Sequence, residues 1–222
     1  MILAFSGVKF AGKDTAVEGL ISRYGFKRIA LADKLKDICS EVFNIPRQHM
    51  DDPTMKEAPF TLAISIGAVH IDNLLGTLAR DGYNFEFYST YELLCKNFMG
   101  KILTTIREVL QVIGTDICRT YIKDDIWLEY IKNEILPNTK YVITDARFEN
   151  ERNYLKQIGA VLILVKRPGF ESKSNHISEN QLGKDSDYDM IAINDTTPHA
   201  LQSGVCMWYT FKYNELLHHF RK

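Results

Sequence analysis

The sequence has no long apolar run and no excess of charge of either sign. Its 222 residues carry 27 basic and 28 acidic side chains, which gives a formal net charge of -1. This balance of charge gives no indication of a protein that binds nucleic acid or a membrane. No apolar stretch approaches the roughly 20 residues that span a bilayer. We therefore expect neither nucleic acid nor a membrane as a partner, and any phosphate binding must be local.

Cysteine is scarce and never closely paired. Cys39, Cys95, Cys118 and Cys206 lie far apart, and no two of them form a C-x-x-C pair. This spacing argues against a zinc site and against a thioredoxin-like redox motif. The apolar residues 1–5 have no basic leader before them, so we expect no signal peptide. Reduced thiols predict a cytoplasmic location.

The sequence does contain enough apolar residues for a full-sized core, since 45% of it is hydrophobic. Short apolar runs alternate with amphipathic segments, and this alternation predicts an α/β fold with a central parallel sheet and helices on both faces. The strands are expected at Ile2–Ser6, Phe26–Leu31, Tyr141–Thr144, Val161–Val165 and Met190–Ile193. The helices are expected at Lys13–Tyr24, at Asp33–Phe43, between the third and fourth strands, and at Trp208–Phe220.

A glycine motif joins the first predicted strand to the first predicted helix. The run Gly7-Val8-Lys9-Phe10-Ala11-Gly12-Lys13-Asp14-Thr15 places two glycines and a lysine at Walker A spacing. Glycines let backbone N–H groups point inward at phosphate oxygens, and the helix N-terminus adds partial positive charge. We expect the ATP phosphates to be bound by Gly7, Val8, Lys9, Ala11, Gly12, Lys13, Asp14 and Thr15. A glycine-rich turn with a solvated lysine is the alternative.

One position departs from the Walker A pattern, because Asp14 stands where Ser or Thr usually follows the lysine. Three interpretations stay open. Thr15 supplies a hydroxyl to Mg²⁺, Asp14 holds the metal directly or through water, or Asp14 only caps the helix, where acidic residues are favoured.

A buried strand ending in an acid and then a base supplies the next candidates. Asp145 and Arg147 follow the strand at Tyr141–Thr144, and carboxyl ends of parallel strands face the ligand crevice. Asp145 would sit near Mg²⁺, while Arg147 and Arg167, which ends the following strand, would face the transferred phosphoryl group. A turn acid and a surface base are the structural alternative.

The segment Ile102–Arg119 shows two stripes at helical spacing. Its apolar stripe would pack on the core and contains Ile102, Ile106, Leu110, Ile113 and Ile117. Arg107, Gln111 and Gly114 share another face with Thr115 at its border. A guanidinium there can grip a phosphate, an amide can read a base edge, and a glycine lets a ring approach. An ordinary solvated helix face explains the spacing equally well. Arg119 and Trp127 are further candidates.

The domain organisation follows from these segments. We expect a single P-loop kinase domain with its core at about 1–45 and 138–222 and a mainly helical acceptor-binding subdomain at about 46–137. The polar stretch at about 167–188 is expected to be a lid that excludes water from the phosphoryl group. A plain surface connection fits its composition as well.

Several segments together resemble the bacteriophage deoxynucleoside monophosphate kinases, a branch of the nucleoside monophosphate kinases. They are Ser6–Lys9 with Gly12–Thr15, Ala32–Lys36, Lys56-Glu57, Leu110–Asp116 with Arg119, Asp145–Glu151, Arg167–Gly169 and His176–Glu179. The aspartate after the loop lysine is similar to this family's own version of the motif. The resemblance covers most of the chain outside residues 60–100.

The resemblance implies an enzyme that uses ATP and Mg²⁺ to convert a deoxynucleoside monophosphate (dNMP) to the diphosphate (dNDP). It implies that the acceptor is contacted by Lys36, Arg107, Gln111, Gly114, Thr115 and Arg119, and we add Asp33 and Trp127 to this predicted site. Lys13, Arg147 and Arg167 would stabilise the transferred charge. The oligomeric state, a homodimer included, stays open. The alternatives are a kinase of dephospho-coenzyme A or phosphomevalonate type, and an ATP-dependent switch without kinase activity.

Overall fold

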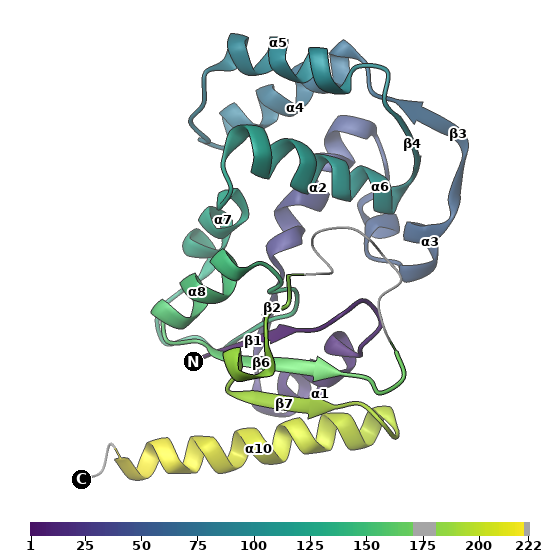
Figure 1. Cartoon of the computed structure of the whole chain (residues 1–222). Coiled ribbons are helices and arrows are strands. Elements are labelled where there is room, and N and C mark those ends of the chain that lie inside the picture. The colour runs from purple at the N-terminus through teal and green to yellow at the C-terminus, as the bar shows by residue number, and fades with distance from the viewer. Residues whose placement is uncertain (171–180, 220–222) are drawn as a thin grey trace. The chain divides into compact units, whose positions relative to one another are not determined.

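The computed structural model describes residues 1–170 and 181–219, with side chains described as far as residue 212. The chain divides into two compact units (Figure 1). The first unit joins Met1–Leu31 to Ile131–Lys222, and the second is the continuous segment Ala32–Tyr130. Residues 171–180, in the middle of the predicted lid, lie outside the described part of the chain.

The first unit is built on a five-stranded sheet in the order β2-β5-β1-β6-β7. Every neighbouring pair is parallel, which confirms the predicted sheet. The strands are β1 Ile2–Ser6, β2 Lys27–Ile29, β5 Tyr141–Ile143, β6 Val161–Lys166 and β7 Met190–Ile193. Because β1 is central, the loop that follows it starts in the middle of the sheet's carboxyl edge.

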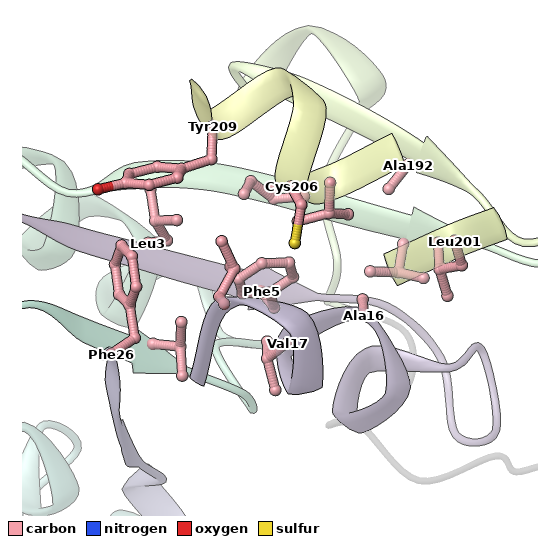
Figure 2. Packing of buried hydrophobic residues seen from close by; sticks show 14 of the residues in the cluster. Leu3, Phe5, Ala16, Val17, Phe26, Ala192, Leu201, Cys206 and Tyr209 are labelled. Atoms are coloured by element: carbon pink, nitrogen blue, oxygen red, sulfur yellow. The ribbon is translucent and has the colours of Figure 1, made fainter. Parts of the chain in front are cut away.

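Helices cover both faces of this sheet. Leu3 and Phe5 of β1 point to one face, where α1 (Lys13–Tyr24) and α10 (Pro198–His219) complete a hydrophobic cluster (Figure 2). Ala4 points to the opposite face of β1 and is equally buried. Leu155 of α8 (Glu149–Gln157) is fully buried where that helix packs against β6. The expected α/β fold is therefore confirmed.

The closing helix is longer than predicted. The sequence places its start at Trp208, whereas α10 begins at Pro198. Proline suits the first turn of a helix because its missing N–H would be unpaired there anyway. Leu201 and Val205 then pack into the cluster beside α1. The predicted end at Phe220 lies outside the described residues.

The second unit is mainly helical and carries one antiparallel pair of strands, β3 and β4. Its strands are β3 Pro59–Ser65 and β4 Ile102–Thr105. Its helices are α2 Leu31–Phe43, η1 Arg47–Met50, α3 Pro53–Glu57, α4 Ala68–Arg80, α5 Phe87–Phe98, α6 Ile106–Gln111 and η2 Val112–Ile122, followed by α7 Ile126–Glu134, which runs into the first unit.

The predicted helix from Ile102 onward is wrong at its start. Residues 102–105 form β4, and Ile102 is 56% exposed. The β-branched run favours a strand, and Thr105 then caps α6 by accepting a hydrogen bond from the Glu108 N–H at 3.1 Å. The other four residues of the apolar stripe are buried as expected.

The helix also changes type within its length. From Val112 to Ile122 it is a π-helix, whose i to i+5 hydrogen bonds widen each turn. The α-helical spacing that places Arg107 and Gln111 together therefore does not extend to Gly114. Gly114 is buried, and a Cβ there would lie 2.4 Å from a methyl carbon of Leu35 in α2. Glycine at this position lets α2 approach the π-helix closely.

Candidate functional site

The glycine motif forms a tight loop between β1 and α1. Gly7, Phe10 and Gly12 have φ angles of 147°, 64° and 101°, values that ordinary side chains rarely adopt. A Cβ on Gly7 would lie 2.5 Å from the Val165 carbonyl oxygen of β6. The loop closes on itself where the Ala11 N–H donates to the Val8 oxygen at 3.1 Å. This strand, loop and helix have the local order that phosphate binding requires.

Lys13 is held within the loop and is not a solvated lysine. Its side chain is buried, and Nζ donates to the carbonyl oxygens of Gly7 and Val8 at 2.8 and 2.9 Å. The ammonium group thus lies across the loop, where phosphate oxygens would compete for the same donor hydrogens.

Asp145 and Arg147 lie in a rigid turn after β5. The Asp145 carboxylate accepts a hydrogen bond from the Leu31 N–H at 2.8 Å. Glu151 is 3% exposed and accepts from the backbone N–H groups of Arg147 and Phe148 at 2.7 and 2.9 Å. The sequence named Glu151 only as part of the resemblance at Asp145–Glu151, although a glutamate three residues into a helix is half of a capping box and signals this role.

Two aromatic rings with a cation at each end join the loop to the residues after β6. Lys9 Nζ lies 4.8 Å from the centre of the Phe10 ring. Phe10 meets Phe170 edge to face, with 6.2 Å between ring centres, and the guanidinium carbon of Arg167 lies 5.4 Å from the centre of the Phe170 ring. Arg167 is thereby held by the same set of contacts as the loop.

Arg107 of the second unit is paired with an acid. Its Nε and Nη2 atoms lie 3.0 and 2.9 Å from the same carboxylate oxygen of Glu57 in α3. The Arg107 side chain is only partly exposed. This contact orients the guanidinium, whose planar array of five donors can grip a further oxyanion.

Lys36 lies in a network of ions at the start of the second unit. Its Nζ atom is 2.9 Å from Asp51 and 3.3 Å from Asp33, and Arg47 also contacts both of these carboxylates. Partial burial opposes ionisation of Asp51, but the hydrogen bond and charge of Lys36, together with Arg47, lower its pKa. The lowered pKa keeps the Asp51 carboxylate ionised at neutral pH.

Arg119 and Trp127 have internal partners. Nη1 of Arg119 donates to the Asp124 carbonyl oxygen at 2.6 Å, and Nε1 of Trp127 donates to the Gly114 carbonyl oxygen at 3.1 Å. Trp127 is 4% exposed, so packing accounts for it without a ligand. Gln111 and Thr115 are half-buried on the same helical segment.

The structure therefore sorts the predicted residues into two groups. The candidates on the donor side, from the glycine loop to Asp145, Arg147 and Arg167, all belong to the first unit. The candidates for acceptor binding all belong to the second, and they are Asp33, Lys36, Arg107, Gln111, Gly114, Thr115, Arg119 and Trp127.

Comparison with known families decides the assignment. The family model for deoxynucleotide monophosphate kinases matches residues 68–205, which is more than half of the chain. The chain belongs to the deoxynucleotide monophosphate kinase family. As a member of this kinase family it is a phosphotransferase.

Viral relatives of this kinase match it along almost its whole length. A mimivirus protein, provisionally named a deoxynucleotide monophosphate kinase, is 28% identical over 92% of this chain and 94% of its own length. The deoxynucleotide monophosphate kinase of phage T4 is 21% identical over 92% of this chain and 96% of its own. A solved dephospho-CoA kinase from Campylobacter jejuni covers 94% of the chain at 16% identity, but its TM-score of 0.36 is too low to support a comparison of sites.

The oxygen donors of this kinase suit Mg²⁺. Among the described residues, no group of three or more His, Cys, Asp or Glu side chains could hold a metal. Mg²⁺ needs no such cluster, since it is usually held by one or two carboxylates, water and substrate phosphates. Asp145, the Thr15 hydroxyl and the exposed Asp14 are hard oxygen donors of the required kind.

Asn194 is a loop contact of the kinase that sequence reasoning missed. It follows β7 directly, and its Nδ2 atom donates to the Ala11 carbonyl oxygen at 2.9 Å. Its place at the carboxyl end of a strand in the parallel sheet is the signal that could have identified it.

The described residues contain no helix that is long and apolar enough to cross a membrane.

Proposed function

We propose that this protein transfers the γ-phosphoryl group of ATP to a dNMP, giving dNDP and ADP. The observation that carries the proposal is the glycine loop, closed around Lys13 at the middle of the parallel sheet, in a chain of this kinase family. A lysine held there can move from two carbonyl oxygens to phosphate oxygens with little change of backbone.

On the donor side, the loop amides and Lys13 would bind the β- and γ-phosphates. Arg147 and Arg167 would spread the negative charge that develops during in-line transfer, in which an acceptor phosphate oxygen attacks the γ-phosphorus. Phosphoryl transfer depends mainly on positioning and electrostatics, so no covalent enzyme intermediate is needed. The fixed turn at residues 145–148 supports this role, because a preorganised group loses little entropy when it acts.

We assign the metal role to Asp145 together with Thr15 or Asp14. Bound Mg²⁺ would neutralise phosphate charge during transfer. The Leu31 N–H already orients one Asp145 oxygen, and Asp14 stands in the first turn of α1, where an acid also stabilises the helix.

On the acceptor side, we propose that Arg107 and Lys36 bind the phosphate of the dNMP. Both are cations whose side chains are already fixed by acids, namely Glu57 and the pair Asp33 and Asp51. Gln111, one turn after Arg107 on α6, would read a base edge through its amide. Gly114, Thr115, Arg119 and Trp127 would shape the helix that presents these groups.

The partners and the cellular location are also part of the proposal. ATP and dNMP are small molecules, so the reaction needs neither nucleic acid nor a membrane. We propose a cytoplasmic location, which the four free cysteines support. The oligomeric state, a homodimer included, stays open.

An acceptor screen tests the proposal. ADP production from Mg·ATP would be followed with dGMP, dTMP, dAMP, dCMP and their ribose counterparts, each supplied singly. Turnover that depends on one or more deoxynucleotides supports the proposal and defines its base selectivity. If dephospho-coenzyme A stimulates turnover and no deoxynucleotide does, the proposed acceptor is wrong.

A further inference from the structure

Asn194 is fixed in position by the sheet. It is the first residue after β7, and its backbone N–H donates to the Lys166 oxygen of β6 at 2.7 Å. This bond continues the β6–β7 pairing by one residue, so the side chain leaves from a rigid edge of the sheet.

The Asn194 side chain reaches back to the glycine loop. Nδ2 donates to the Ala11 carbonyl oxygen at 2.9 Å, across 183 positions of sequence. A Cβ built on Gly12 would lie 2.5 Å from the same nitrogen atom. The amide group therefore occupies the space beside Gly12 that any other residue at position 12 would need.

The bond to Ala11 also fixes the next N–H group. In a planar trans peptide, the C=O of one residue and the N–H of the following residue point in opposite directions. The described chain contains no cis peptide bond. With the Ala11 oxygen turned toward Asn194, the Gly12 N–H points away from Asn194.

We propose that Asn194 is a positioning residue for the donor phosphates. It holds the peptide between Ala11 and Gly12 in the orientation that presents the Gly12 N–H to a phosphate oxygen. The ligand class is the polyphosphate of a nucleoside di- or triphosphate. This inference rests on the proposed function for the identity of the donor.

Two variants test the role of Asn194. Asn194→Ala removes the donor, and Asn194→Asp keeps the shape but offers no hydrogen and adds a negative charge. Loss of an oriented hydrogen bond near a charged ligand should weaken binding of Mg·ADP and of inorganic tripolyphosphate by about tenfold. The effect of Asn194→Asp should be larger than that of Asn194→Ala. In steady-state assays, the KM for ATP should rise while the KM for the acceptor changes less than about twofold.

Gln202→Ala is the matched control. Gln202 of α10 also uses a side-chain amide, which bonds to Glu18 of α1 rather than to the loop. We expect this variant to bind Mg·ADP and tripolyphosphate as the wild type does. Binding would be measured by isothermal titration calorimetry on the full-length protein, and folding by thermal melting.

The outcomes separate the inference from the proposed function. Unchanged binding of tripolyphosphate by Asn194→Ala would overturn the positioning role, as would a loss of ADP affinity that tripolyphosphate does not share. A wild type that binds Mg·ADP but makes no dNDP would refute the proposed reaction. The binding constants of the Asn194 variants would still test the positioning role, because they do not depend on turnover.

Discussion

In the proposed function, Lys13 is the loop cation that would bind the ATP phosphates, and its ammonium group donates to two carbonyl oxygens of the loop. Lys13→Ala removes that charge where the transferred phosphoryl group would develop its own. We expect kcat/KM for ATP to fall at least about a hundredfold, as for loss of other preorganised electrostatic groups. Coupled ADP release measures the effect, and an unchanged circular dichroism spectrum shows that the fold is kept. A rate near that of the wild type would refute the assignment of this loop.

Arg107 is the corresponding residue on the proposed acceptor side. Arg107→Ala should raise the KM for the dNMP by roughly ten- to a hundredfold, since a charged hydrogen bond contributes about 1.5–3 kcal/mol. The KM for ATP should stay the same. Initial rates at varied dNMP and fixed ATP give both constants.

Arg80→Ala is the control for this comparison. Arg80 also belongs to the second unit, and it forms an exposed ion pair with Glu41. Exposed pairs contribute little, so its kinetic constants should match those of the wild type. Equal changes in both variants would mean that Arg107 acts only through the stability of the second unit.

Single residues also show the limit of sequence reasoning. The Walker A glycines and Lys13 could be placed because the motif is local and each residue has a fixed task. Asn194 could not be linked to Ala11, because the 183 positions between them are bridged only by the folded sheet. Glu57 was known only as part of a resemblance until its contact with Arg107 was seen.

Substituting a glycine of the loop should lower the free energy of unfolding. Gly7→Ala would need a positive φ and would press a Cβ against the Val165 oxygen, which is backbone and cannot move aside. We expect a loss of about 3 kcal/mol, as the sum of left-handed strain and overpacking. Urea unfolding monitored by circular dichroism gives the free energy of unfolding.

Gly25→Ala provides the comparison for Gly7→Ala. Gly25 ends α1 with a φ of 69°, but nothing lies within 4 Å of a Cβ built there. The substitution should cost only the strain of the left-handed conformation, about 1 kcal/mol. If Gly7→Ala lowers the free energy of unfolding by no more than Gly25→Ala does, the close approach of the loop to β6 contributes nothing to the cost of the substitution at Gly7.

Elements whose apolar residues recur at a clear helical or strand spacing were predictable, and elements determined by tertiary contacts were not. The strands of the first unit follow from short apolar runs between glycines and helices. The switch from β4 to helix at Thr105 was missed because Ile102 fits the apolar period of the following helix by chance. The π-helix was also not predicted, and within it the Gly114 carbonyl oxygen accepts a hydrogen bond from Trp127, a tertiary contact that no local pattern records.

The whole molecule should lose stability in acid through its second unit. Four of its carboxyl groups have lowered pKa values: Glu41 beside Arg80, Asp52 and Glu108 through backbone N–H groups, and Asp51 through Lys36 despite partial burial. A pKa that is lower in the folded state means that the unfolded chain binds more protons. The resulting stability is present above the unfolded pKa of about 4 and is lost as the pH falls through the folded value.

Thermal melting at a series of pH values checks this expectation. The melting temperature should change little between about pH 7 and pH 5 and then fall below about pH 4. Asp51→Asn should make the fall shallower, because one of the titrating groups is gone. A melting temperature that rises in acid would contradict the signs of these shifts.

At the scale of the whole chain, the sequence predicted the proposed donor side from physical pattern, and the proposed acceptor side partly from helical spacing and mainly from resemblance. A strand, a glycine loop and a helix are adjacent in sequence, so their chemistry can be inferred directly. Lys36, Glu57 and Arg107 are far apart in sequence, and their ion pairs are seen only in the folded second unit.

The most direct test of the account follows the phosphoryl group itself. ATP labelled with radioactive phosphorus at the γ-position would be incubated with the wild-type protein, Mg²⁺ and each dNMP in turn, and the products would be separated by thin-layer chromatography. We expect the label to move into dNDP, and Lys13→Ala to abolish this transfer. Label that appears only as inorganic phosphate, whichever dNMP is present, would show that the protein hydrolyses ATP and is not the proposed kinase.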